Sequence, residues 1–195
     1  MKRFFVLSVL ISLLIACGGI PPSSLPRLLK LQSEFFRANP VDFMLAIQVD
    51  RRMVPPAHAS PVLHLTIRPS EAGAFEPMDK KLAMSFQILA VDSLQLPKPI
   101  GNRRWLVYGL APESQAELRR IQNNFKRLQA QRQSGVIISV GIAQDGVAAK
   151  DPALASTRWE SWLQTSRQEG FFEVWSGSIA ELHKRAKDCA AANAA

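Results

Sequence analysis

The chain has 195 residues, of which 47% are hydrophobic, and a formal net charge of +8 at pH 7. This length suits one domain with a single buried core, because domains usually have roughly 100–200 residues. Two cysteines are too few for a Cys-rich metal site. A moderately basic surface suits contact with anionic lipid or an acidic partner, and it equally suits plain solubility.

The N-terminus has the pattern of a secretory signal. Lys2 and Arg3 precede an uncharged, apolar run over residues 4–15. A basic start, an apolar run of about 7–15 residues and a small-residue junction are typical of such signals. The run is too short for a transmembrane helix, which needs about 20 apolar residues.

The end of this signal, Leu14-Ile15-Ala16-Cys17, resembles the lipobox of bacterial lipoproteins. The resemblance implies cleavage between Ala16 and Cys17 and diacylation of the Cys17 thiol. Two or three acyl chains such as palmitate make a stable anchor, since each buried methylene contributes about 0.8 kcal/mol. The residue after the cysteine is Gly18, whereas an Asp at this position would favour retention in the inner membrane. The resemblance therefore implies that the chain is anchored at the periplasmic face of the outer membrane, with the inner membrane as the alternative.

The sequence divides into four parts. They are a lipoprotein signal peptide at 1–16, a lipidated tether at 17–24, a single α+β domain at 25–188 and a disordered, Ala-rich tail at 189–195. Loss of Lys2 and Arg3 with the signal lowers the formal charge from +8 to +6. Cys189 then stands alone in an oxidising compartment. We expect an incidental thiol there, or an intermolecular disulfide.

The first half of the domain has one helical segment and then four strand segments. Apolar residues recur at helical spacing from Leu25 to Arg37, with Pro26 in the first turn. Alternating apolar residues then predict half-buried strands at 43–50, 62–68, 82–89 and 104–108. In the third of these, Phe86 and Ile88 are expected to face inward. Four successive strands suggest an antiparallel meander.

The second half contains three capping boxes, in which Ser or Thr is followed three residues later by Glu. Ser114–Glu117 predicts a long amphipathic helix. Thr157–Glu160 predicts a second helix, with Trp159 and Trp162 on one face. Ser178–Glu181 predicts the terminal helix.

Two further strands are expected in this half. The apolar run at 136–142 predicts a central strand buried on both faces, and 171–175 predicts the last strand. The sequence therefore predicts an α+β fold, with an antiparallel or mixed sheet of about six strands packed with three to four helices. Parallel pairing through a β-α-β unit at 103–142 stays open at this point.

No motif for catalysis, metal binding or cofactor binding is evident. The histidines, His58, His64 and His183, are scattered without metal-ligand spacing. No nucleophile elbow and no phosphate-binding loop is present. The carboxylates of Glu160, Glu169 and Glu173 are the residues from which a glycoside or peptidoglycan hydrolase would draw its acid and base. We expect no cofactor and no metal.

The long predicted helix carries a basic face opposite its apolar stripe. The residues of this face are Arg119, Arg120, Lys126, Arg127 and Arg132. One explanation is favourable interaction with the helix dipole and with solvent, and the other is docking of an anionic headgroup or an acidic partner. Trp159 and Trp162 are candidate binding residues too. The aromatic cluster to which they belong is expected in the core, and any Trp left exposed would mark a partner groove.

These patterns favour a non-catalytic outer-membrane lipoprotein that serves as an accessory or anchoring subunit of an envelope complex. Its expected partners are the membrane, through the anchor, and an envelope protein. Nucleic acid is not an expected partner of an exported, lipid-anchored chain. The alternatives are an envelope enzyme that acts on peptidoglycan or lipid, and a carrier of an apolar ligand.

Overall fold

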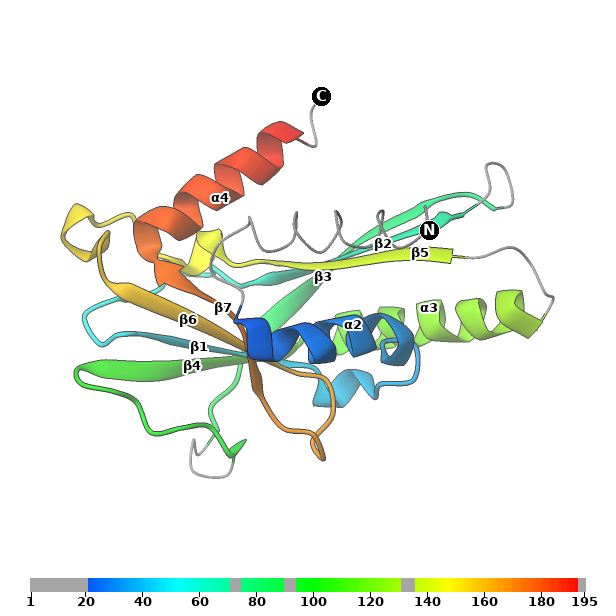
Figure 1. The fold of residues 1–195 in the computed structure, drawn as a ribbon, viewed down its shortest axis with the longest axis horizontal. Coiled ribbons are helices and arrows are strands. Elements are labelled where there is room, and N and C mark those ends of the chain that lie inside the picture. The colour runs from blue at the N-terminus through cyan, green and yellow to red at the C-terminus, as the bar shows by residue number, and fades with distance from the viewer. Residues whose placement is uncertain (1–20, 71–74, 90–93, 131–135, 193–195) are drawn as a thin grey trace, which may run out of the picture.

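A computed structural model describes residues 21–70, 75–89, 94–130 and 136–192. These residues form an antiparallel sheet with strand order β5-β2-β3-β4-β1-β6-β7, together with three α-helices (Figure 1). The strands are β1 (Met44–Asp50), β2 (Val62–Pro69), β3 (Met78–Phe86), β4 (Arg103–Leu110), β5 (Val136–Ala143), β6 (Arg158–Gln164) and β7 (Phe172–Ser178). The helices are α2 (Leu25–Glu34), α3 (Pro112–Ala130) and α4 (Ile179–Ala192). The predicted α+β class is confirmed, with seven strands in place of about six.

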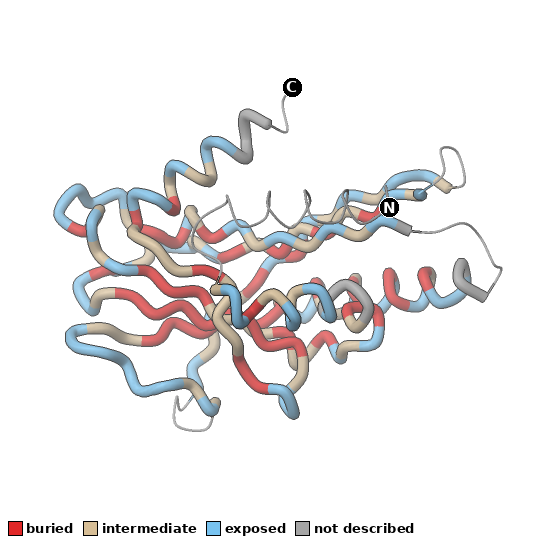
Figure 2. The backbone as a smooth tube through the Cα atoms, in the orientation of Figure 1, coloured by how far each residue is buried: buried red, intermediate tan, exposed pale blue. Residues whose placement is uncertain are grey.

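Strand β1 lies in the middle of the sheet, between β4 and β6. Leu45 is opposite Tyr108 of β4 and Leu163 of β6. The sequence predicted a strand with one buried face, and this was wrong, because Ala46 and Gln48 on the other face are buried as well. Figure 2 shows buried backbone along the central strands.

Two layers of apolar side chains account for this double burial. The larger layer lies between the sheet and the helices and includes Leu45, Leu65 and Leu118. The smaller layer lies on the opposite face, where Ala46, Trp105, Val107 and Phe171 pack together with Leu94, Leu96 and Trp162. The segment before β4 covers this second face, and the Trp105 indole donates a hydrogen bond of 2.9 Å to the Pro97 carbonyl.

The β3 strand begins and ends earlier than the sequence predicted. It starts at Met78 and ends at Phe86. Phe86 is 53% exposed and Ile88 is 94% exposed, so the expectation that both face inward was wrong. Phe86 is the last residue paired with β4, and its ring is inclined by 72° to that of Tyr108, with centroids 5.6 Å apart.

The β5 strand is an edge strand, and the prediction of a central strand was wrong. Among the described strands it pairs with β2 alone, in antiparallel register, which excludes parallel pairing with β4. Within its apolar run, the side chains alternate between a face toward the core and a face away from it. Ile138, Val140 and Ile142 pack against the core, whereas the intervening positions carry the small residues Ser139 and Gly141.

The β6 segment was predicted as a helix and is a strand. Trp159, Ser161 and Leu163 are buried on one face, and Glu160 and Gln164 are buried on the other. The segment pairs with both β1 and β7. Aromatic residues favour the pleated surface of a sheet. Glu160 does not cap a helix, because its carboxylate accepts hydrogen bonds from two arginines.

The helices begin at residues that differ in part from the predicted caps. α3 starts at Pro112, a position that proline favours, so Ser114 lies inside the helix and is not its cap. The third capping box is confirmed: the Ser178 backbone N–H donates to Glu181 Oε2 at 2.6 Å, and the Glu181 N–H donates to Ser178 Oγ at 3.2 Å. α4 continues to Ala192, so the helix includes most of the predicted tail.

The N-terminal features fall largely outside the described residues. This holds for the signal peptide and for Cys17. The end of the predicted tether, Pro22–Ser24, forms a short 3-10 helix with Ser24 buried. No helix within the described ranges is long and apolar enough to span a membrane.

Candidate functional site

The three histidines lie on separate elements. His58 precedes β2, His64 is half-buried in β2, and His183 belongs to α4. Among the described residues, no group of three or more His, Cys, Asp or Glu side chains is close enough to hold a metal ion.

Two of the three carboxylates considered for catalysis are held in ion pairs. Glu160 Oε1 lies 2.8 Å from Arg103 Nη1 and 2.6 Å from Arg158 Nε. Burial raises the pKa of Glu160, but the hydrogen bonds from both guanidinium groups outweigh burial, so the pKa lies below its usual 4.5. Glu169 pairs with Lys30 at 2.5 Å, and this hydrogen bond lowers its pKa. Both carboxylates are therefore ionised at neutral pH, whereas a general acid needs a raised pKa.

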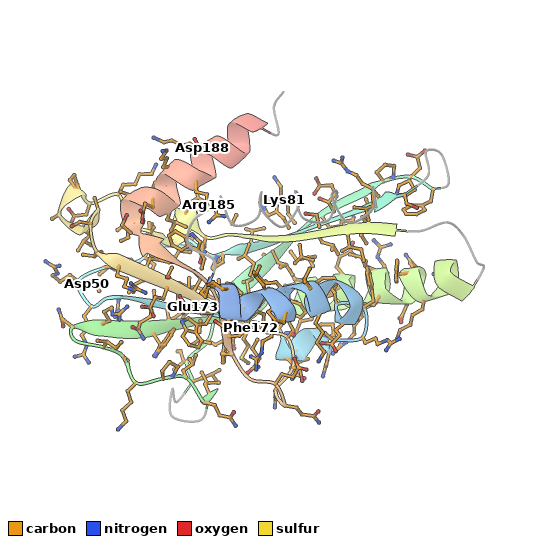
Figure 3. All side chains as sticks on the ribbon, viewed as in Figure 1. Asp50, Lys81, Phe172, Glu173, Arg185 and Asp188 are labelled. Carbon is orange, nitrogen blue, oxygen red and sulfur yellow. The ribbon has the colours of Figure 1, made fainter. Side chains whose placement is uncertain are left out.

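The third carboxylate, Glu173, is half-buried on β7 (Figure 3). It lies opposite Trp162 in the β6–β7 pair, where a bulge interrupts the register between Ser161 and Trp162. Glu160 also belongs to β6, but its backbone partner is Ser176. Glu160 and Glu173 are therefore not directly opposite each other in the β6–β7 pair.

The two tryptophans proposed as binding residues point to opposite faces of the sheet. Trp159 is 0% exposed in the main core, and its indole N–H donates to Ser161 Oγ at 3.0 Å. Trp162 packs on the second face, edge-on to Trp105 with ring centroids 5.9 Å apart. Trp159 is inaccessible to a partner, so the two residues do not form one binding surface.

The four basic residues proposed for binding in the described part of α3 are all exposed. We call Arg119, Arg120, Lys126 and Arg127 the basic surface. Arg120 is neutralised by Glu117, whose pKa falls to about 2 through hydrogen bonds from Arg120 first and then Lys80, against the effect of burial. Neither Arg119 nor Lys126 has an ion pair with another described residue. Arg132 lies outside the described ranges.

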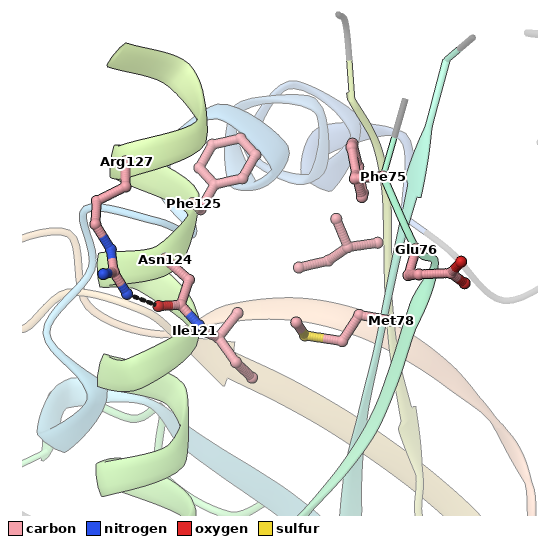
Figure 4. A pocket seen from close by; sticks show the side chains of 8 residues that line it. Phe75, Glu76, Met78, Ile121, Asn124, Phe125 and Arg127 are labelled. Carbon is pink, nitrogen blue, oxygen red and sulfur yellow. Dashed lines mark hydrogen bonds between the residues drawn. The ribbon is translucent and has the colours of Figure 1, made fainter. Parts of the chain in front are cut away.

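An apolar groove of about 390 Å³ opens between α3 and the start of β3. Figure 1 shows β2, β3 and β5 extending alongside α3 toward the same end of the molecule. The lining residues are Ile67, Phe75, Glu76, Met78, Ile121, Asn124, Phe125 and Arg127 (Figure 4). Sequence reasoning missed Phe75 and Met78, because both lie between the predicted strands at 62–68 and 82–89. The one signal was Phe75, an aromatic residue between the two strands.

Comparisons with protein-family models, with curated proteins and with solved structures find no match.

Proposed function

We propose that this chain is a lipid-anchored, non-catalytic subunit of an envelope complex, held through Cys17 at the periplasmic face of the outer membrane. Its contact with the complex is the basic surface of α3, and the partner presents an acidic protein surface. The lowered pKa values of Glu160 and Glu169 support the non-catalytic part of the proposal.

One observation carries the docking site: Arg119 and Lys126 are exposed and form no ion pair with another described residue. Seven positions apart on a helix, they lie on the same side of α3. The helix dipole explains cations only in the last turn, since its effect falls off within about one turn of the end. Arg119 lies in the middle of α3, which spans Pro112–Ala130.

An acidic partner suits this arrangement. Unpaired surface cations raise the rate of association with an anionic patch, and the attraction weakens with salt. Arg120 contributes less to this attraction than Arg119, since Glu117 already neutralises it.

The test places a photoreactive amino acid at Asn123, which is exposed and lies between Arg119 and Lys126. Irradiation of cells is expected to link the full, lipidated chain to one envelope protein through an acid-rich peptide, identified by mass spectrometry. The Arg119→Glu/Lys126→Glu variant is expected to lose this adduct. Lys184→Glu/Lys187→Glu on α4 is the matched control, since both lysines are exposed and the charge change is the same.

Retention of the adduct in the Arg119→Glu/Lys126→Glu variant would overturn the docking site. Equal loss of the adduct in the Lys184→Glu/Lys187→Glu control would also overturn the docking site, because partner binding would then depend on the net charge of the chain and not on α3. Adducts with phospholipid alone would replace the acidic protein with the membrane surface as the partner.

A further inference from the structure

The groove beside α3 has an apolar floor and walls. Ile67, Ile121 and Phe125 are 4%, 1% and 6% exposed, and Phe75 and Met78 are partly buried against the same core. These five side chains come from β2, from β3 and the segment just before it, and from α3. An apolar cleft with a few polar groups at its rim is typical of a small-molecule site.

The size of the groove limits its occupant. Small-molecule sites have volumes of about 300–1,000 Å³, and this groove of about 390 Å³ lies near the lower limit. It suits one alkyl chain better than the two chains of a phospholipid. A docked protein element would need far more contact area, since stable interfaces bury about 800 Å² per partner.

The rim of the groove carries a cation, Arg127, on the side formed by α3. The Arg127 Nη2 donates a hydrogen bond to Asn124 Oδ1 (Figure 4). A guanidinium has five N–H donors in a planar fork that matches a carboxylate, so donors remain for a ligand. The Glu76 carboxylate is directed away from α3, so it does not oppose an anion at Arg127 (Figure 4).

We propose that this groove binds one long-chain fatty acid, with its alkyl chain between Met78 and Phe125 and its carboxylate at Arg127. The single tail is inferred from the volume, and the headgroup charge from Arg127 at the rim. The inference goes beyond the proposed function and does not rest on it. The groove shares Arg127 with the basic surface, but neither Cys17 nor an acidic partner takes part in the binding.

The test uses the full-length, lipidated protein in lipid nanodiscs and palmitate that carries a photoreactive diazirine. After irradiation, mass spectrometry is expected to find adducts on peptides from 75–78 and 121–127. Unlabelled palmitate is expected to compete for these adducts, whereas hexadecanol, which lacks the carboxylate, competes about tenfold less well.

Two adjacent asparagines provide matched variants. Asn124 lines the groove, whereas Asn123 is exposed and is not among the lining residues. Asn124→Trp fills the groove and is expected to abolish the groove adducts, and Asn123→Trp is expected to leave them unchanged. Circular dichroism of both variants checks that they are folded.

The exposed residue Arg127 gives a variant that does not endanger the fold. Arg127→Gln is expected to weaken palmitate about tenfold, through loss of a charge-assisted hydrogen bond, while Arg120→Gln has no effect. Adducts confined to the N-terminal peptide, or equal labelling in the two Trp variants, would overturn the proposal. Equal competition by hexadecanol and palmitate would overturn the role of Arg127. Loss of the acidic partner in the crosslinking test would leave these results unchanged.

Discussion

The ring of Phe36 stacks on the ring of Phe125, with centroids 3.7 Å apart and planes inclined by 15°. Phe36 follows α2, and Phe125 belongs to α3 and lines the groove. The Gln122 side-chain amide of α3 donates to the carbonyls of Phe35 and Ala38, both at 2.9 Å. The segment after α2 is thus attached to α3 by an aromatic pair and by two hydrogen bonds.

We expect Phe36→Ala to lower the free energy of unfolding by about 3–5 kcal/mol, because Phe36 is 5% exposed and the truncation leaves a cavity against Phe125. Urea denaturation followed by circular dichroism measures the change. Phe86→Ala is the control: Phe86 is 53% exposed, and a loss of about 1 kcal/mol or less is expected. Equal losses in the two variants would contradict the packing described here.

Two glycines in strands give a second matched pair. A Cβ atom on Gly177 would lie 2.6 Å from Cζ2 of Trp175, a buried side chain, whereas a Cβ atom on Gly141 would meet nothing within 4 Å. We expect Gly177→Ala to lower the free energy of unfolding by about 1–3 kcal/mol through overpacking. Gly141→Ala is expected to leave it unchanged or to raise it by about 0.5–1 kcal/mol, because glycine weakens a strand. Thermal melting of both variants measures the changes in stability. A Gly177→Ala variant more stable than the wild type would refute overpacking against Trp175.

Glu160→Gln is expected to lower the free energy of unfolding at neutral pH by about 1–3 kcal/mol, since it leaves the Arg103 guanidinium partly buried beside a weaker acceptor. The pKa of Glu160 in the folded chain lies below its usual 4.5. The ionised carboxylate therefore stabilises the fold above pH 4.5, and this contribution disappears as the pH falls through the lowered pKa.

The difference between wild type and Glu160→Gln is thus expected to shrink on acidification, as measured by urea denaturation over a pH series. Arg158→Gln serves as the comparison, because the Arg158 side chain is 60% exposed and its loss is expected to cost about 1 kcal/mol or less. A difference that stays constant with pH would show that the carboxylate charge does not matter.

Cys17→Ala is expected to abolish labelling of the chain by radioactive palmitate in cells and to shift the protein away from the outer-membrane fraction. Cys189→Ala is the matched control, and its labelling is expected to equal that of the wild type. Labelling that persists without Cys17 would refute the lipobox prediction.

Local patterns predicted several elements well. The alternation of Leu63, Leu65 and Ile67 indicated β2, and all three side chains are buried as that pattern requires. The Ser178–Glu181 box indicated the start of α4 at Ile179. In both cases the decisive interactions lie within a few residues of each other in the sequence.

The Thr157–Glu160 box shows where local patterns fail. The same spacing that satisfies two amides at a helix start also occurs by chance in a strand. Long-range pairing with β1 and β7 decided the conformation, and Arg103, a residue far away in the sequence, took the Glu160 carboxylate.

Patterns of neighbouring residues were enough to predict the α+β class, the segments that alternate with a period of two, and the lipobox at Cys17. The strand order, the place of β5 at the edge and the second buried face of β1 became known from the tertiary structure alone. The tertiary structure also decided the groove, whose walls at Ile67 and Ile121 come from distant parts of the chain. Periodicity reports which side of a segment is apolar, whereas the neighbour that covers that side depends on pairing between segments far apart in the sequence.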